Sequence, residues 1–217
     1  MALQLSLLGG ADPAVAPGAT VERIALDRRS WVDVSREWLL GGDTMLDALV
    51  ERVDWRQGRR KMWERVLDDP RLTRWYHRDE PLPHPALERI GAALEMRYGV
   101  PLAGPALNYY RDGADSVAPH ADRELRVLDD TLICIVTLGA RRPFLVKPKT
   151  GGRSLDVAPG SGDLLVMGGA TQLGFTHAVP KVAHAGPRVS MSWRWTKQVR
   201  PRAVAKSADE LEVATRP

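Results

Sequence analysis

Thr131-Leu132-Ile133-Cys134-Ile135-Val136-Thr137-Leu138 is the longest of several short apolar segments that follow Gly104. The others are Ala106 to Tyr110, Pro143 to Val146, Ser154 to Val157, Asp163 to Met167 and Val189 to Trp195. Turns that contain Gly, Pro and Asp separate these segments. Short strands at such intervals are typical of an antiparallel barrel or a jelly roll, and not of βαβ units. We therefore predict a chain whose second half is mainly β.

Two helices are predicted upstream of these strands. Asp43 can cap a helix whose apolar residues recur at helical spacing, namely Met45, Leu46, Leu49, Val50 and Val53. A second helix is predicted from about Pro85 to Tyr98, because Pro is favoured at the first helical position and Gly99 ends the pattern. Residues 29–34 are predicted to form a first strand.

Composition indicates a globular chain with one principal domain. The 217 residues are 44% hydrophobic and 27% charged, with a formal net charge of +4. We expect a flexible leader over 1–20, a single domain over 21–197 and a polar tail over 198–217. No apolar run is long enough for a membrane span, and the only cysteine, Cys134, favours a reducing, cytoplasmic location.

Pro119-His120-Ala121-Asp122 is the first stretch that suggests chemistry. Side chains two apart in an extended strand share a face, so His120 and Asp122 are expected to point the same way. Together with a second imidazole, His120 and Asp122 would offer a metal two nitrogen ligands and one carboxylate ligand. This set suits iron(II) and leaves coordination positions on the metal open. His177 is the favoured third ligand, and His184, in a loop, is the weaker candidate. The motif His120-x-Asp122 is by itself short enough to occur by chance.

The strand from Arg188 to Arg194 adds a second feature. Arg188, Ser190, Ser192 and Arg194 alternate with apolar residues and share one face. Two guanidinium groups on one face can bind the carboxylates of a small diacid, which suggests 2-oxoglutarate beside the metal. The alternative is a half-exposed edge strand with two ordinary surface arginines, and the spacing does not choose between the two interpretations.

Six ordered motifs together resemble the AlkB family of 2-oxoglutarate- and iron(II)-dependent dioxygenases. They are Asn108-Tyr109-Tyr110-Arg111-Asp112-Gly113, Asp115-Ser116-Val117, His120-x-Asp122, Gly168-Gly169-Ala170-Thr171-Gln172, His177-Ala178-Val179-Pro180-Lys181 and Pro187-Arg188-Val189. Pro70 to Tyr76 is similar to part of the family's nucleotide-recognition lid, here placed at about 55–83. The resemblance implies an α+β, mainly β fold: a double-stranded β-helix (jelly roll) core with N-terminal helices packed outside.

The resemblance also implies roles for individual residues. His120, Asp122 and His177 would bind Fe(II). Asn108, Tyr110, Arg188, Ser190 and Arg194 would surround 2-oxoglutarate, although Ser190 stands where Asn is common in the family. The substrate would contact Glu124 and three lid residues, Arg71, Trp75 and Tyr76. For the two lid aromatics, packing between helix and sheet is an equally weighted alternative.

The implied activity is oxidative removal of alkyl groups from damaged bases of the 1-methyladenine and 3-methylcytosine type, that is, direct-reversal DNA repair. Fe(II), 2-oxoglutarate and dioxygen would be required, and the partner would be nucleic acid, with the target base flipped out. One alternative is a 2-oxoglutarate oxygenase that acts on a small molecule or a protein. Another is a nucleic-acid-binding module without catalysis, which three intact ligand positions argue against.

The leader contains one further motif. Gln4-Leu5-Ser6-Leu7-Leu8 resembles the short peptide by which bacterial replication and repair proteins bind the sliding clamp. Residues 9–18 would then serve as a flexible tether. The alternative is a leucine-rich start that covers a neighbouring helix.

Overall fold

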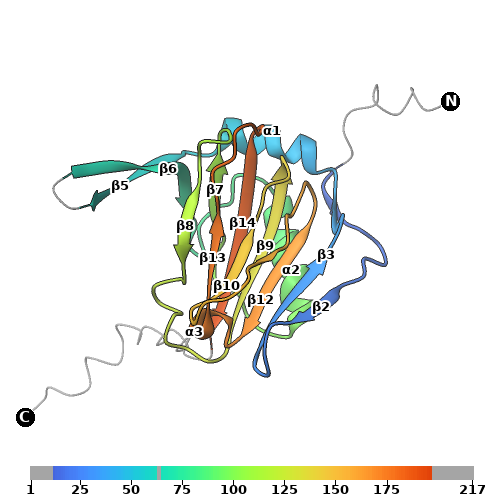
Figure 1. The fold of residues 1–217 in the computed structure, drawn as a ribbon. Coiled ribbons are helices and arrows are strands. Elements are labelled where there is room, and N and C mark those ends of the chain that lie inside the picture. Colours follow the sequence, from blue (N-terminus) through green and yellow to red (C-terminus); the bar gives the residue numbers. More distant parts are fainter. Residues whose placement is uncertain (1–11, 63–64, 197–217) are drawn as a thin grey trace, which may run out of the picture.

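Two antiparallel sheets form the core of the computed structural model, which describes residues 12–62 and 65–196, the side chains of residues 60–65 excepted (Figure 1). The larger sheet has eight strands in the order β2-β3-β12-β9-β14-β7-β6-β5, and the smaller has four in the order β11-β10-β13-β8. A short pair, β1 with β4, lies apart from both. The predicted jelly-roll class is confirmed.

The larger sheet is built from β2 (Glu22–Ala25), β3 (Ser30–Ser35), β5 (Arg56–Met62), β6 (Arg65–Trp75), β7 (Ala106–Tyr110), β9 (Thr131–Gly139), β12 (Leu164–Gly169) and β14 (Arg188–Thr196). The smaller contains β8 (Val117–His120), β10 (Leu145–Pro148), β11 (Leu155–Asp156) and β13 (Phe175–Val179). The remaining elements are β1 (Ala14–Val15), β4 (Leu39–Leu40), α1 (Gly42–Arg52), α2 (Ala86–Tyr98) and the single turn α3 (Thr171–Gly174).

Side chains on the two faces of the larger sheet belong to two separate clusters. On one face Met191 and Trp193 of β14 join Leu87 and Leu94 of α2 in the outer cluster. On the other face Ile133 of β9 joins residues of the smaller sheet in the inner cluster. The helices therefore cover the outside of the larger sheet, as predicted, and the smaller sheet packs on its other face (Figure 1).

β14 lies in the middle of the larger sheet, hydrogen-bonded to β9 on one side and β7 on the other. The interpretation of this segment as a half-exposed edge strand is therefore wrong. Its alternation is as predicted: Val189, Met191 and Trp193 face the helices, while Arg188 and Ser190 are buried on the opposite face.

The helix ends agree with the sequence in part. Gly99 follows α2 in the left-handed conformation, with φ 68°, as predicted for a helix stop. Asp43 does not cap α1: Gly41 holds the cap position, and Asp43 lies in the first turn, where its charge complements the helix dipole. In the part of the chain that the structure describes, no helix is both long and apolar enough to cross a membrane.

Two segments differ from the sequence-based expectation. The predicted flexible leader is wrong for residues 12–20, because β1 pairs with β4 and Asp12 forms an ion pair of 3.0 Å with Arg89 of α2. The basic segment after Trp55 forms a hairpin, β5 and β6, which extends the larger sheet and projects from the body (Figure 1). The expected lid is therefore built largely on paired strands. Gln4–Leu8 and the predicted tail lie outside the described residues.

Candidate active site

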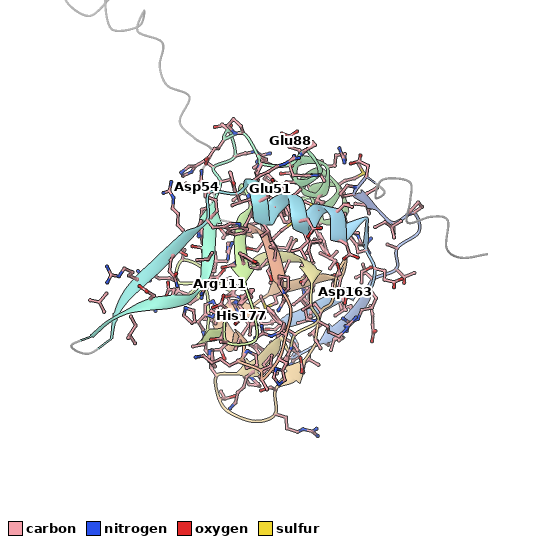
Figure 2. The ribbon with its side chains drawn as sticks, turned by 90° about the horizontal axis from the view of Figure 1, so that it is seen from above. Glu51, Asp54, Glu88, Arg111, Asp163 and His177 are labelled. Carbon is pink, nitrogen blue, oxygen red and sulfur yellow. The ribbon has the colours of Figure 1, made fainter. Side chains whose placement is uncertain are left out.

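The smaller sheet holds the two predicted histidine ligands side by side. His120 of β8 and His177 of β13 are cross-strand partners, and their ring centroids are 4.3 Å apart. His177 lies within the body of the molecule (Figure 2). Pairing of adjacent strands at this register therefore fixes the spacing of the two imidazoles.

Asp122 completes the cluster from just beyond the strand. β8 ends at His120, so the expectation that one extended strand carries both residues is wrong. The Asp122 carboxylate nevertheless turns toward both rings: its Oδ1 is 3.6 Å from His120 Nε2 and 3.8 Å from His177 Nε2. One donor atom of each residue lies within 4.8 Å of the others, which is compact enough for one metal ion. His184, the weaker candidate, is exposed in a loop, and His84 Nδ1 accepts from the Ala86 N–H.

The protonation states suit metal binding. Burial and the nearby His120 lower the pKa of His177 to about 3, so its imidazole is neutral near pH 7. His120 Nδ1 lies 3.0 Å from the Ala118 carbonyl, which favours a proton there and leaves Nε2 free toward the cluster. Burial alone would raise the pKa of Asp122, but His120, Arg194 and His177 outweigh it and hold the pKa well below its ordinary value. A neutral imidazole at His177 and an ionised carboxylate at Asp122 are the forms in which these side chains bind a divalent metal.

Arg194 contacts the metal cluster itself. Its Nε donates to Asp122 Oδ2 at 2.6 Å, and its Nη1 donates to Ser192 Oγ at 3.0 Å. Its guanidinium also lies 4.9 Å from the Trp75 ring. The second arginine of the predicted clamp is thus engaged with Asp122, and Oδ1 remains the free carboxylate oxygen.

Arg188 is a buried cation with no acidic partner among the described residues. It is 0% exposed, and its Nε and Nη1 have no hydrogen-bond partner in that part of the chain. Nη2 lies 3.4 Å from Thr137 Oγ1, and the guanidinium stands 5.5 Å from the Tyr110 ring. Burial lowers the pKa of Arg188 to about 10, which still leaves it charged near pH 7. A bound carboxylate would satisfy both the charge and the unpaired N–H groups.

Neighbouring strands bring the other predicted co-substrate residues to Arg188. In the register of β7 with β14, Tyr110 is opposite Arg188 and Asn108 is opposite Ser190. Asn108 Oδ1 accepts from Arg71 Nε at 3.0 Å, and Arg71 Nη1 is buried without a partner in the described chain. Arg71, expected among the substrate residues, thus lies beside the co-substrate set.

A cavity of about 410 Å³ joins the predicted groups. Its lining comprises Asp69, Arg71, Thr73, Trp75, Asn108, Tyr110, Val117, His120, Asp122, Arg123, Glu124 and Arg194. Two residues of the metal cluster, three co-substrate residues and three substrate residues therefore share one space. The sequence interpretation missed Thr73, although it alternates with Arg71 and Trp75 along β6.

The two lid aromatics separate in the structure. Trp75 lines the cavity and is 57% exposed. Tyr76 is buried in the outer cluster with α2, and the Arg74 guanidinium lies 4.4 Å from its ring. Tyr76 follows the last residue of β6 and packs among the residues of the outer cluster, so the packing interpretation holds for it. The prediction that it contacts substrate is wrong for this structure.

Comparison with known proteins places these features in context. The profile of the 2OG-Fe(II) oxygenase superfamily matches residues 46–205. The chain is 30% identical over 219 residues to "Alpha-ketoglutarate-dependent dioxygenase alkB homolog 3" of Mus musculus, which covers 88% of this chain and 76% of that protein. It is 31% identical over 134 residues to "DNA oxidative demethylase ALKBH2" of Arabidopsis thaliana, covering 51% of this chain and 43% of that protein.

Solved structures share the fold. "The structure of OsALKBH1" superimposes with a TM-score of 0.53 at 12% identity and covers 81% of this chain and all of that one. A prolyl hydroxylase from Trichoplax adhaerens, solved with a hypoxia inducible factor peptide, superimposes with a TM-score of 0.53 at 11% identity. The match covers 70% of this chain and 74% of that one. At these identities the likeness concerns the jelly roll alone.

Proposed function

The chain belongs to the 2OG-Fe(II) oxygenase superfamily and, within it, to the AlkB family, and we propose that it removes alkyl groups from damaged DNA bases. The observation that carries the proposal is the shared cavity. Its lining includes His120 and Asp122 of the metal cluster together with an exposed indole, Trp75, and a carboxylate, Glu124. A metal ligand set alone would fit any oxygenase of the superfamily, whereas an aromatic face with an acidic group suits a cationic base.

His120, Asp122 and His177 would hold Fe(II) on one side through two Nε2 atoms and Asp122 Oδ1. Such a facial set leaves the opposite positions open. When bound, iron together with 2-oxoglutarate supplies the activation of dioxygen and the oxidation of an N-methyl group. Arg194 keeps Asp122 Oδ2 occupied, so the carboxylate presents one oxygen to the metal.

Arg188 would bind a carboxylate of 2-oxoglutarate through its unpaired N–H groups. Asn108, Tyr110 and Ser190, on the adjoining strands, would orient the rest of the molecule. In the overall reaction, 2-oxoglutarate and dioxygen become succinate and carbon dioxide, and the methyl group leaves the base as formaldehyde. The protein's share of this chemistry is to place the methyl group near the metal and to exclude water.

Glu124, on the substrate side of the cavity, would suit a base that carries positive charge. 1-Methyladenine and 3-methylcytosine are cationic near neutral pH, and the Glu124 carboxylate faces the same cavity. Trp75 would stack on the base, which must leave the helix to reach the metal. Arg59 of β5, 69% exposed, would contact the phosphate backbone.

The test is turnover of single-stranded oligonucleotides that contain 3-methylcytosine, 1-methyladenine or the neutral lesion O6-methylguanine, followed by mass spectrometry. We expect the two cationic lesions to be repaired in preference to the neutral one. In a Glu124→Gln variant, the rates of repair of the cationic lesions and of the neutral lesion should lie closer together. Consumption of 2-oxoglutarate with no oligonucleotide repaired would favour an oxygenase that acts on a small molecule or a protein.

Gln4–Leu8 lies outside the described residues, and we propose it as a docking peptide for a bacterial sliding clamp, acting in the cytoplasm. Retention of purified clamp by the wild type and not by Leu7→Ala/Leu8→Ala would support this contact. Equal retention by both proteins would exclude it.

A further inference from the structure

Asp122 is held in place by a side chain from a distant part of the sequence. Because β8 ends at His120, sheet pairing does not fix the Asp122 backbone. Its N–H donates to Gln172 Oε1 at 2.9 Å in a buried hydrogen bond, while its carbonyl accepts only from the following residues Leu125 and Arg126. In the described chain, Gln172 is the only residue of another element that hydrogen-bonds the Asp122 backbone, while Arg194 holds the carboxylate.

Gln172 is itself rigidly placed. It is 1% exposed and lies in α3, the single turn that joins β12 to β13. Lys149 Nζ donates to the carbonyls of Gln172 and Leu173 at 2.9 and 2.8 Å, and Thr171 Oγ1 donates to the Gly168 carbonyl. These contacts fix the backbone of α3, and the buried Gln172 side chain reaches from that fixed backbone to the Asp122 N–H.

We infer that Gln172 is a positioning residue for the metal site, one that ties Asp122 to the strand carrying His177. The histidines are fixed to one another by the pairing of β8 with β13. β13 follows α3 directly, so the Gln172 hydrogen bond links the third ligand to the same unit. The inference rests on the proposed role of the three residues as metal ligands.

The chemistry of the amide agrees with this role. Gln172 Nε2 is buried and has no hydrogen-bond partner among the described residues, an arrangement that costs stability. A leucine would avoid that cost but would leave the Asp122 N–H unpaired instead. The exchange replaces one buried unpaired donor by another, so we expect the folded state to tolerate it. The function of the amide is then the acceptor oxygen that it offers to Asp122.

The experiment compares Gln172→Leu, Gln172→Glu and the control Gln57→Leu, whose glutamine is exposed on the β5–β6 hairpin. Mn(II) binding is measured by isothermal titration, and thermal unfolding of the metal-free proteins is followed in parallel. Substitutions that disturb the support of a metal ligand typically cost ten- to hundredfold in affinity, so we expect a loss of roughly that size in Gln172→Leu. Gln172→Glu keeps the acceptor oxygen and should lose less affinity for Mn(II) than Gln172→Leu. Gln57→Leu should be unchanged.

Wild-type affinity in Gln172→Leu would overturn the inference, as would an equal loss in Gln172→Glu, since the acceptor is intact there. If Gln172→Leu does not fold, Gln172→Met replaces it, and we expect the same loss of Mn(II) affinity. Gln172→Glu still tests the acceptor oxygen. Failure of the wild type to bind Mn(II) at all would instead contradict the metal assignment of His120, Asp122 and His177.

Discussion

Arg188 combines complete burial with unpaired N–H groups, and this combination separates a binding role from a structural one. Replacing it with Met should weaken 2-oxoglutarate binding to the Mn(II)-loaded protein by roughly ten- to hundredfold, the value of about one charged hydrogen bond. The free energy of unfolding of the ligand-free protein should stay the same or rise, because a buried unpaired cation is removed. Titration calorimetry and denaturant unfolding measure the two effects. Arg153→Ala, an exposed arginine, serves as the control. A large loss of stability with unchanged affinity would make Arg188 a structural residue.

His177 predicts a pH dependence for the metal-free protein. Burial first, and then the charge of His120, lower its pKa to about 3, against about 6.5 in the unfolded chain. Between these pH values the unfolded state binds a proton that the folded state does not, so the free energy of unfolding falls as pH falls. The loss begins below about pH 6.5 and amounts to at most about 1.4 kcal/mol per pH unit. Urea unfolding in the presence of a chelator measures this effect. As pH falls, the free energy of unfolding should decrease more steeply for the wild type than for His177→Gln. Parallel pH curves for the two proteins would contradict this.

Trp75 and Tyr76 are adjacent residues with opposite expected effects. Trp75→Ala should raise the KM for a methylated oligonucleotide by roughly five- to a hundredfold, since stacking on a base contributes about 1–3 kcal/mol. Tyr76→Phe keeps the ring in the outer cluster and should leave KM unchanged. Steady-state kinetics on one substrate distinguishes the pair. A larger effect at Tyr76 than at Trp75 would reverse the assignment of the two faces.

At the residue level, the sequence was informative where a short motif specifies geometry. His120 and His177 could be proposed as metal ligands in advance because both lie in motifs that match the AlkB family in order. Tyr76 and Gln172 could not be assigned in this way. The position of Tyr76 depends on its packing against α2, and the contact of Gln172 with Asp122 crosses 50 positions of sequence.

The β5–β6 hairpin is the element expected to bind the nucleic-acid backbone. Changing Arg59, Arg60 and Lys61 to Ser should weaken binding to single-stranded DNA similarly for all sequences. The slope of log K against log salt should fall by about two, since each phosphate contact on a single strand contributes about 0.7. Fluorescence anisotropy at several salt concentrations is the measurement. The control is a triple variant that changes three exposed arginines outside the hairpin to Ser and removes the same number of positive charges: Arg52, Arg97 and Arg153. Equal slopes in the two triple variants would exclude the hairpin as the contact.

Elements were predicted best where local pattern and tertiary packing agree. α2 has an apolar stripe and a glycine stop, and it forms over the expected residues. The hairpin was not foreseen as strands, because its charged sequence lacks apolar alternation and its pairing comes from extending the sheet at β7. β1 was missed for a similar reason: two residues that pair with β4 leave no periodic signal.

At the scale of the whole molecule, the two sheets divide the site between them. The smaller sheet carries the histidines on β8 and β13, and the larger carries the candidate co-substrate residues on β7 and β14. The cavity between them is then closed on one side by β6. The jelly-roll class followed from the spacing of short strands, but the distance across this cavity depends on how the sheets face each other, which strand pattern alone does not specify.

The most direct test of the proposed demethylation is the stoichiometry of its products in a single reaction. Wild-type protein with Fe(II), 2-oxoglutarate, dioxygen and an oligonucleotide containing 3-methylcytosine is sampled over time for succinate, formaldehyde and unmodified cytosine. We predict that the three products appear in equal amounts, and that Asp122→Ala forms none of them while remaining folded. Formation of succinate that does not depend on the oligonucleotide, with neither formaldehyde nor cytosine produced, would contradict the proposed demethylation.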